Sequence, residues 1–195
     1  MQEQINTKKY LDYILDTTKK ILAIDSPSGF TKRAADYVLK EYAMLGYAPT
    51  QTVKGGVLCE IGSNTHQDNA LVMEAHIDTL GAMVCAINPN GCLMLSPIGG
   101  MNANNAEAEN CRVYTREGKS YTGTFQLCDA SIHVNNKFDE TSRSFDVMEV
   151  VLDENVKTKE DTLSLGILPG DIVCFDPRNT ITDTGYIKSR FLDDK

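Results

Sequence analysis

A histidine and an aspartate two positions apart form the most chemically suggestive pair in this sequence. His76 and Asp78 follow an apolar run, residues 70–75, which predicts a buried strand. In an extended chain alternate side chains point to the same side, so the two would lie about 7 Å apart. An imidazole at this spacing could bind a metal ion while the carboxylate orients the ring or acts on a ligated water. On the pair alone, a core histidine beside a turn aspartate is the commoner arrangement.

Two further aspartates, Asp193 and Asp194, follow a stretch that alternates like a strand, residues 185–191. Charged residues at a chain end are most often solvated, but the strand-like residues before these two favour a site. Sites in α/β sheets lie at the ends of strands. We therefore predict that His76 and Asp193 come within metal-bridging distance of each other in the folded chain.

The elements that must position these residues begin with two amphipathic helices. Apolar residues recur at helical spacing over residues 5–24 and 31–45, with charged residues between them. Two short strands are expected at 47–54 and 57–61, ahead of the buried strand at 70–75. This order of helices and strands predicts an α/β sheet layered with helices, to which residues 185–191 would return.

The pattern changes after Gly81 to short β-like runs separated by turn residues. A helical period between 82 and 180 is suggested only around residues 157–163. We therefore expect an inserted all-β unit at about 82–184 with a core of its own. The predicted core residues are Val84, Ile87, Leu93, Val113, Phe125, Val147, Val150, Ile172 and Phe175.

The composition argues against several classes of protein for this chain. The 195 residues include 27 Asp and Glu against 19 Lys and Arg, a formal net charge of -8, which argues against nucleic acid or an anionic membrane as the main partner. No apolar run approaches the roughly 18 residues of a membrane span, and the first ten residues lack the apolar segment of a secretory signal. The six cysteines are scattered, as in a cytoplasmic protein with reduced thiols.

Four separate stretches carry a resemblance to a known family: SPSG at 26–29, AHIDTLGAMV at 75–84, LGI-x-PGD at 165–171 and GYIKSRFLDDK at 185–195. In these motifs and their order the chain resembles the tetrahedral aminopeptidases, metallopeptidase family forty-two, of the glutamyl aminopeptidase and cellulase M type. The resemblance implies a partial α/β/α sandwich of the two-metal exopeptidase type, interrupted by a β-barrel-like insert. The catalytic domain would be residues 1–81 and 185–195, and the insert, 82–184, would be of the dimerisation type.

The resemblance also implies roles for individual residues. His76 would bind one metal ion, Asp193 would bridge two, and Asp78 would be the carboxylate that orients the site. Asp194 is similar to the family's following aspartate, which a cis peptide joins to the bridging one. Two divalent ions, zinc, cobalt or manganese, suit such nitrogen and oxygen ligands. The implied function is removal of N-terminal residues from peptides by metal-activated water, in a cytoplasmic homo-oligomer.

The chain departs from the family in extent and at one residue of a motif. Many members carry Asp-Glu where Asp78-Thr79 stands here, which we interpret as variation within the family. The family's general-base glutamate, remaining carboxylate ligands and second histidine all follow the Asp-Asp-Lys motif, and neither His66 nor His133 replaces them. The chain therefore resembles the N-terminal half of a member and is expected to be inactive as a peptidase by itself.

Two other functions remain open from the sequence. A glycoside hydrolase needs two carboxylates about 5–9.5 Å apart and usually no metal, for which Glu74 and Asp78 are candidates. That chemistry has no need of the adjacent histidine or of the distant Asp-Asp pair. Alternatively, the chain could be a non-catalytic assembly or regulatory fragment that pairs through its insert and binds metal poorly or not at all.

Overall fold

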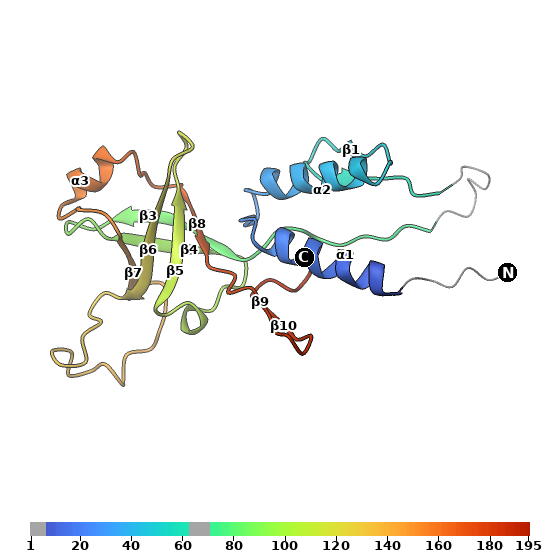
Figure 1. Ribbon diagram of the computed structural model, residues 1–195. Helices are drawn as coiled ribbons and strands as arrows, with labels where there is room; N and C mark the ends of the chain where they lie inside the picture. The colour runs from blue at the N-terminus through green and yellow to red at the C-terminus, as the bar shows by residue number, and fades with distance from the viewer. Residues whose placement is uncertain (1–6, 63–70) are drawn as a thin grey trace. The chain divides into compact units, whose positions relative to one another are not determined.

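The computed structural model describes residues 7–62 and 71–195, and the chain divides into two compact units (Figure 1). The barrel unit is Thr79–Asp176. The two-segment unit combines the residues up to Asp78 with Pro177–Lys195. The barrel unit ends at Asp176, before the expected boundary at 184, and residues 177–184, which include one strand of a hairpin, belong to the two-segment unit.

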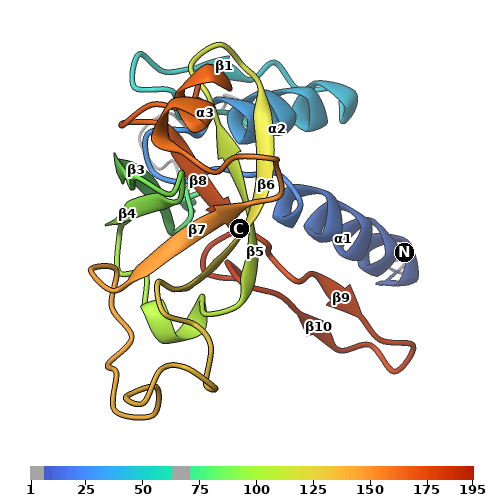
Figure 2. The ribbon, with the colours of Figure 1, turned by 90° about the vertical axis from the view of Figure 1, so that its left-hand side faces the viewer.

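Six antiparallel strands of the barrel unit close into a barrel in the order β3-β4-β7-β6-β5-β8 (Figure 2). The expected β-rich insert with a barrel-like sheet is confirmed. A 3-10 turn, η2 (Ala103–Asn105), precedes β5, and a short helix, α3 (Lys159–Ser164), separates β7 from β8. The strands are β3 (Gly81–Ile87), β4 (Leu93–Ile98), β5 (Glu109–Tyr114), β6 (Ser120–Leu127), β7 (Met148–Leu152) and β8 (Ile172–Phe175).

The barrel encloses a core made of the residues that alternate along each strand. Phe125 is fully buried at its centre, with ring centroids 5.2 Å from Phe145 and 5.6 Å from Phe175. Two predicted core residues differ: Val147 is 36% exposed and Ile172 is only half-buried. Val147 immediately precedes β7, whose core residues are Met148, Val150 and Leu152. A period of two therefore places Val147 on the outer face.

Gly123 on β6 lies where the next strand leaves no space for a side chain. It faces Leu152 of β7, and a Cβ at this position would lie 2.6 Å from the carbonyl oxygen of Val151 and 2.8 Å from Cγ1 of Val150. We expect Gly123→Ala to destabilise the barrel unit by about 2 kcal/mol, because backbone must move to relieve the overlap. Urea unfolding followed by circular dichroism measures this. Gly100→Ala is the matched control, since nothing lies within 4 Å of its added Cβ, and equal stability of the two variants would contradict the prediction.

The two-segment unit contains two helices, α1 (Thr7–Leu22) and α2 (Lys32–Met44), close to their expected bounds. Lysines in the last turn of α1 complement the helix dipole, and Gly46, with φ of 89°, follows the end of α2 in the left-handed conformation that glycine tolerates. No helix in the described part of the chain is long and apolar enough to cross a membrane.

The strands of the two-segment unit are much shorter than expected. They form two separate hairpins, β1 (Thr50–Gln51) with β2 (Val57–Leu58) and β9 (Thr180–Ile181) with β10 (Ile187–Lys188). The strand expected at 185–191 is thus reduced to two residues, and it pairs with β9 rather than with the first sheet. A sheet layered between helices therefore remains a prediction for this unit.

The buried strand expected at 70–75 is not formed in the described residues, which begin again at Leu71. Residues 71–75 have no helix or strand, and Leu71, Val72 and Met73 are 88%, 77% and 88% exposed. A strand exists only when a neighbour satisfies its peptide groups, and none of the described strands pairs with this segment. The prediction from the apolar run was wrong for this chain because the run alone does not supply that neighbour.

Candidate metal centre

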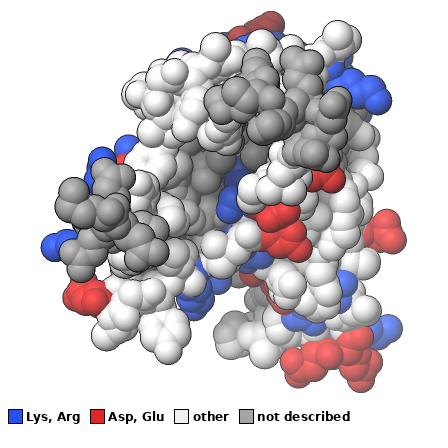
Figure 3. Space-filling view, turned by 90° about the vertical axis from the view of Figure 1, so that its right-hand side faces the viewer, with Lys and Arg blue, Asp and Glu red and all other residues white. Residues whose placement is uncertain are grey.

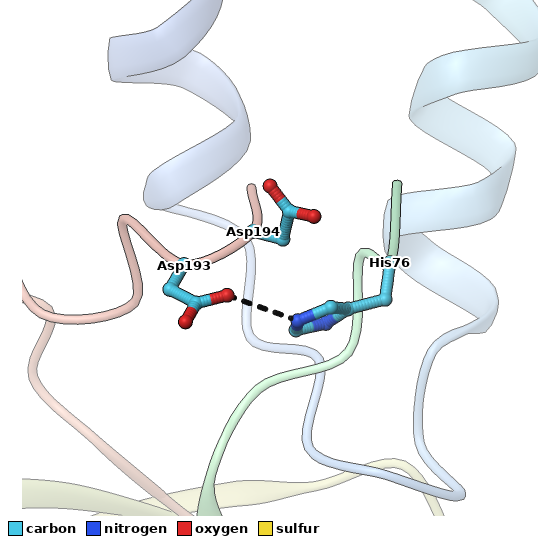
Figure 4. A group of neighbouring side chains, drawn as sticks. All are labelled: His76, Asp193 and Asp194. Atoms are coloured by element: carbon cyan, nitrogen blue, oxygen red, sulfur yellow. Dashed lines mark hydrogen bonds and ion pairs between the residues drawn. The ribbon is translucent and has the colours of Figure 1, made fainter. Parts of the chain in front are cut away.

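Three side chains of the two-segment unit bring metal-ligand atoms together at one point. Nε2 of His76 lies 3.3 Å from Oδ1 of Asp193 (Figure 4). One possible ligand atom from each of His76, Asp193 and Asp194 lies within 4.8 Å of the other two. Residues 7–62 and 71–195 contain no other group of three His, Cys, Asp or Glu residues with this property. The geometry thus joins positions that are 117 residues apart in the sequence.

The loop after α1 holds the His76 segment in place through two serine hydroxyls. Ser26, fully buried, donates to the carbonyl oxygen of Ile77 at 2.8 Å, and Ser28 donates to Oδ2 of Asp78 at 2.5 Å. Gly29, with φ of 86°, allows the tight turn of this loop before α2 begins. The stretch SPSG therefore positions Ile77 and Asp78, the two residues that follow His76.

Removing the buried hydroxyl has a larger expected cost than removing the exposed one. Ser26→Ala would leave the carbonyl oxygen of Ile77 without its donor, so we expect the free energy of unfolding to fall by about 1–2 kcal/mol. Ser28→Ala is the control in the same loop, and we expect less than about 1 kcal/mol because water replaces the bond at an exposed site. Urea unfolding measures the loss of stability in each variant. A larger loss in Ser28→Ala than in Ser26→Ala would contradict the prediction.

The surroundings of His76 orient its ring. Nδ1 lies 3.0 Å from the carbonyl oxygen of Asp78 and 3.3 Å from Oδ1 of the same residue. With the proton on Nδ1, that nitrogen donates to the carbonyl and the lone pair of Nε2 faces Asp193. The hydrogen bond to the Asp78 carbonyl, followed by that to the Asp193 carboxylate, raises the pKa of His76 above its ordinary value. Two acceptors this close require a proton or a cation between them, so the arrangement suits a positive ligand.

The aspartate pair is held by the end of the chain around it. The peptide bond between Asp193 and Asp194 is cis, as the resemblance implied. The ammonium group of Lys195 donates to the carbonyl oxygen of Ile24, and the backbone N–H of Arg190 donates to that of Pro177 at 2.7 Å. These contacts bring the Asp-Asp pair beside the start of the SPSG loop.

The donor set fits a divalent metal ion by its chemistry. One imidazole nitrogen and carboxylate oxygens, without a thiolate, are ligands that zinc, cobalt and manganese accept. The side chains of His76 and Asp193 are 52% and 97% exposed, so the ligand atoms are accessible. Three donors from the described residues match one catalytic zinc ion with an open position, and a second ion would have to share them.

The sequence predicts His76, Asp78 and Asp193 as site residues, and the structure places each of them near the candidate metal centre. The structure brings His76 and Asp193 together, and the carboxylate of Asp78 lies on the other side of the ring. Sequence reasoning did not assign Asp194 as a ligand, although its adjacency to Asp193 was a usable signal. His133 lies exposed in the barrel unit, and His66 lies outside the described residues.

Comparison with known proteins gives consistent matches over most of the chain. A model described as M42 glutamyl aminopeptidase matches residues 55–195. "Putative aminopeptidase YhfE" of Bacillus subtilis (strain 168) is 40% identical over 185 residues, which cover 93% of this chain and 52% of that protein. The chain thus spans about half the length of the curated relatives it matches, in their N-terminal part.

Solved structures with the same fold include aminopeptidases and a protein of Thermotoga maritima described as an endoglucanase. An aminopeptidase of the archaeon Desulfurococcus kamchatkensis is 23% identical with a TM-score of 0.77, covering 95% of this chain and 49% of that one. The TET1 peptidase of Pyrococcus horikoshii, which can assemble into a tetrahedron or a large octahedral shell, is 22% identical with a TM-score of 0.76 and 92% and 52% coverage.

Proposed function

Because the chain belongs to the M42 glutamyl aminopeptidase family, we propose that it supplies the metal-binding, N-terminal part of an enzyme that removes N-terminal residues from peptides. The observation that carries this proposal is the convergence of the His76 nitrogen with the carboxylates of Asp193 and Asp194. One imidazole and two carboxylates at one accessible point provide three protein ligands, the number that a catalytic zinc ion commonly has.

Each residue has a role that follows from its position. His76 would bind an ion through Nε2, since Nδ1 is engaged by Asp78. Asp78 would fix the ring and its tautomer, as second-shell carboxylates and carbonyls commonly do. Asp193 would offer its two oxygens to two ions, with Asp194 beside it. Bound divalent ions in such sites supply Lewis acidity toward a scissile carbonyl and toward water.

The wider organisation belongs to the same proposal. The described hairpins of the two-segment unit would form part of an α/β/α sandwich, and the barrel unit would make subunit contacts in a homo-oligomer. The assemblies of the Pyrococcus horikoshii peptidase, which shares the fold, support an oligomer. The six free cysteines suit a reducing compartment, so we propose a cytoplasmic protein with two zinc, cobalt or manganese ions per site.

The test separates the aminopeptidase from its rivals. This chain and a version extended by the remainder of the Bacillus subtilis relative are assayed against aminoacyl-p-nitroanilides with added zinc, cobalt or manganese. We expect the extended protein to hydrolyse them and a chelator to stop it, while the chain alone is inactive. The lost general base alone is typically worth a factor of about 10²–10⁴ in rate.

The other outcomes have definite meanings. Hydrolysis of a polysaccharide substrate that survives the chelator would overturn the proposal in favour of a glycoside hydrolase using Glu74 and Asp78. Silence of the extended protein toward every peptide substrate, with no metal bound, would favour the assembly or regulatory fragment. Comparable turnover by the chain alone would contradict the expectation that it is inactive by itself.

A further inference from the structure

We propose that Ser28 is a positioning residue of the candidate metal centre. Ser28 is not a ligand, but its hydroxyl holds the carboxylate of Asp78, and that carboxylate holds the ring of His76. The inference rests on the proposed function in one respect, that a metal ion binds through Nε2 of His76. The effect of Ser28 on the ring itself needs no metal ion, so the two can fail separately.

The first observation is a series of contacts that runs from the loop after α1 to the metal-ligand atoms. The hydroxyl of Ser28 donates to Oδ2 of Asp78 at 2.5 Å, and Oδ1 of the same carboxylate lies 3.3 Å from Nδ1 of His76. Across the ring, Nε2 of His76 lies 3.3 Å from Oδ1 of Asp193. One oxygen of Asp78 therefore contacts the serine while the other contacts the ring that would bind the ion.

The second observation is that the two serines of this loop hold different parts of the same segment. Ser26 donates to the carbonyl oxygen of Ile77, so it holds the backbone. Nδ1 of His76 also lies 3.0 Å from the backbone carbonyl oxygen of Asp78, a contact that depends on that backbone. The separate contribution of Ser28 is the direction of the Asp78 carboxylate.

The third observation is that a tight turn gives the Ser28 hydroxyl a defined position. The backbone N–H of Phe30 donates to the carbonyl oxygen of Pro27 at 2.7 Å, which closes a turn around Ser28 and Gly29. Gly29, the third residue of this turn, has φ of 86°, which glycine adopts without strain. A hydroxyl held by such a turn keeps one direction. A water molecule in its place would satisfy the carboxylate oxygen without fixing where the carboxylate points.

The direction of the Asp78 carboxylate matters to a metal ion because it favours one tautomer of His76. With Oδ1 of Asp78 facing Nδ1, the proton stays on Nδ1 and the lone pair of Nε2 is available to the ion. The side chain of Asp78 is 41% exposed, so without Ser28 it would turn toward water for part of the time. The ring would then carry its proton on Nε2 more often, where the proton competes with the ion. The backbone carbonyl of Asp78 retains part of the preference, so the effect of Ser28 should be smaller than that of the whole Asp78 side chain.

The first test measures the zinc affinity of the chain and not its activity. Asp78→Ala is expected to lower the affinity about 10–100-fold, the range for a group that orients a metal-ligating histidine. Ser28→Ala, one step further from the ion, should lower it at least about threefold and by less than Asp78→Ala. Ser28→Thr keeps the hydroxyl and should restore the affinity. In a chain that already carries Asp78→Ala, Ser28→Ala should cause no further loss, because the two residues act in series.

The matched control is Thr52→Ala in the same two-segment unit. The hydroxyl of Thr52 is also exposed and also makes a local hydrogen bond, which it accepts from the backbone N–H of Gly56 at 3.0 Å. We expect its removal to leave the zinc affinity unchanged. Exposed carboxylates elsewhere bind zinc weakly; on the face shown in Figure 3 they lie in small separate groups. This weak binding is common to all the variants, so it cancels when their affinities are compared.

The second test needs no metal ion. The nitrogen chemical shifts of a neutral imidazole distinguish a proton on Nδ1 from a proton on Nε2. They are recorded by NMR in excess chelator, and the signals of His76 are identified by their loss in His76→Ala. We expect the Nδ1 tautomer to dominate in the parent chain and in Ser28→Thr, and a mixture of the two tautomers in Ser28→Ala. A merely structural role of Ser28 would lower the stability without changing the tautomer.

Each result decides for or against the inference. An unchanged tautomer in Ser28→Ala would overturn it, whether or not the chain binds zinc. A loss of zinc affinity that Ser28→Thr does not restore, or that is undiminished in the Asp78→Ala chain, would overturn it as well. A zinc affinity that neither His76→Ala nor Ser28→Ala changes would overturn the inference together with the proposed function. A changed tautomer in a chain that binds no zinc would support the role of Ser28 at the ring and count against the proposed function only.

Discussion

Phe125→Ala is expected to lower the free energy of unfolding of the barrel unit by about 3–5 kcal/mol. Phe125 has no exposed surface and packs against the rings of Phe145 and Phe175. Truncation removes the transfer free energy of the ring and leaves a cavity that a closed barrel cannot collapse to fill, because its strands are hydrogen-bonded on both sides. Urea unfolding followed by circular dichroism gives the change.

The control for this prediction is Ile132→Ala in the loop between β6 and β7. Ile132 is 59% exposed, so its truncation should change the stability by no more than about 0.5 kcal/mol. If the two units unfold separately, only the transition of the barrel unit should move to lower urea in Phe125→Ala. A loss below about 1 kcal/mol would show that Phe125 is not the centre of a tightly packed core.

The barrel could be predicted from sequence because its signals are local. Alternation along a strand such as β6 marks the inward residues, and turn residues such as those around Gly118 separate neighbouring strands. Each strand also finds its partner within the same 98-residue stretch, Thr79–Asp176. Val147 shows the limit of this reasoning, since a position just outside a strand looks the same as one inside it.

The strands of the two-segment unit could not be predicted in the same way. Residues 71–75 have the composition of a buried strand, but burial and pairing depend on a neighbour that the pattern does not contain. Residues 185–191 alternate correctly, yet the strand is limited to Ile187–Lys188, and Phe191, with φ of 66°, is in the left-handed region where a strand does not continue. Strand propensity is a property of one segment, whereas a sheet forms only when several segments pair with one another.

The candidate metal centre could be predicted from the sequence in part. The proximity of His76 and Asp193 was expected from the resemblance and from their places after apolar runs, and the 3.3 Å contact agrees with it. Asp194 was expected only as the counterpart of the family's following aspartate and was not predicted as a ligand. In the structure one possible ligand atom of Asp194 lies within 4.8 Å of those of His76 and Asp193, and Figure 4 shows the three side chains together.

His76→Ala is expected to reduce the affinity of the chain for zinc or cobalt at least about 100-fold. His76 supplies the sole nitrogen among the three ligand atoms that converge in the described residues, and Nε2 is the atom nearest to Asp193. Loss of a group that merely supports a ligand costs 10–100-fold in metal affinity, so loss of the ligand should cost at least the upper end of that range. Equilibrium dialysis and the visible absorption of bound cobalt report the affinity and the change in ligands.

The matched control is His133→Ala, which removes the exposed histidine of the barrel unit and should leave metal affinity unchanged. Asp183→Ala, in the turn between β9 and β10, removes an exposed carboxylate of the two-segment unit and should be equally silent. If His76→Ala and His133→Ala weaken binding by the same factor, metal associates with exposed imidazoles in general, and the converging geometry has no special affinity. If His76→Ala alone weakens it, His76 is a ligand of a specific site, and exposed imidazoles or carboxylates elsewhere in the chain do not account for the binding.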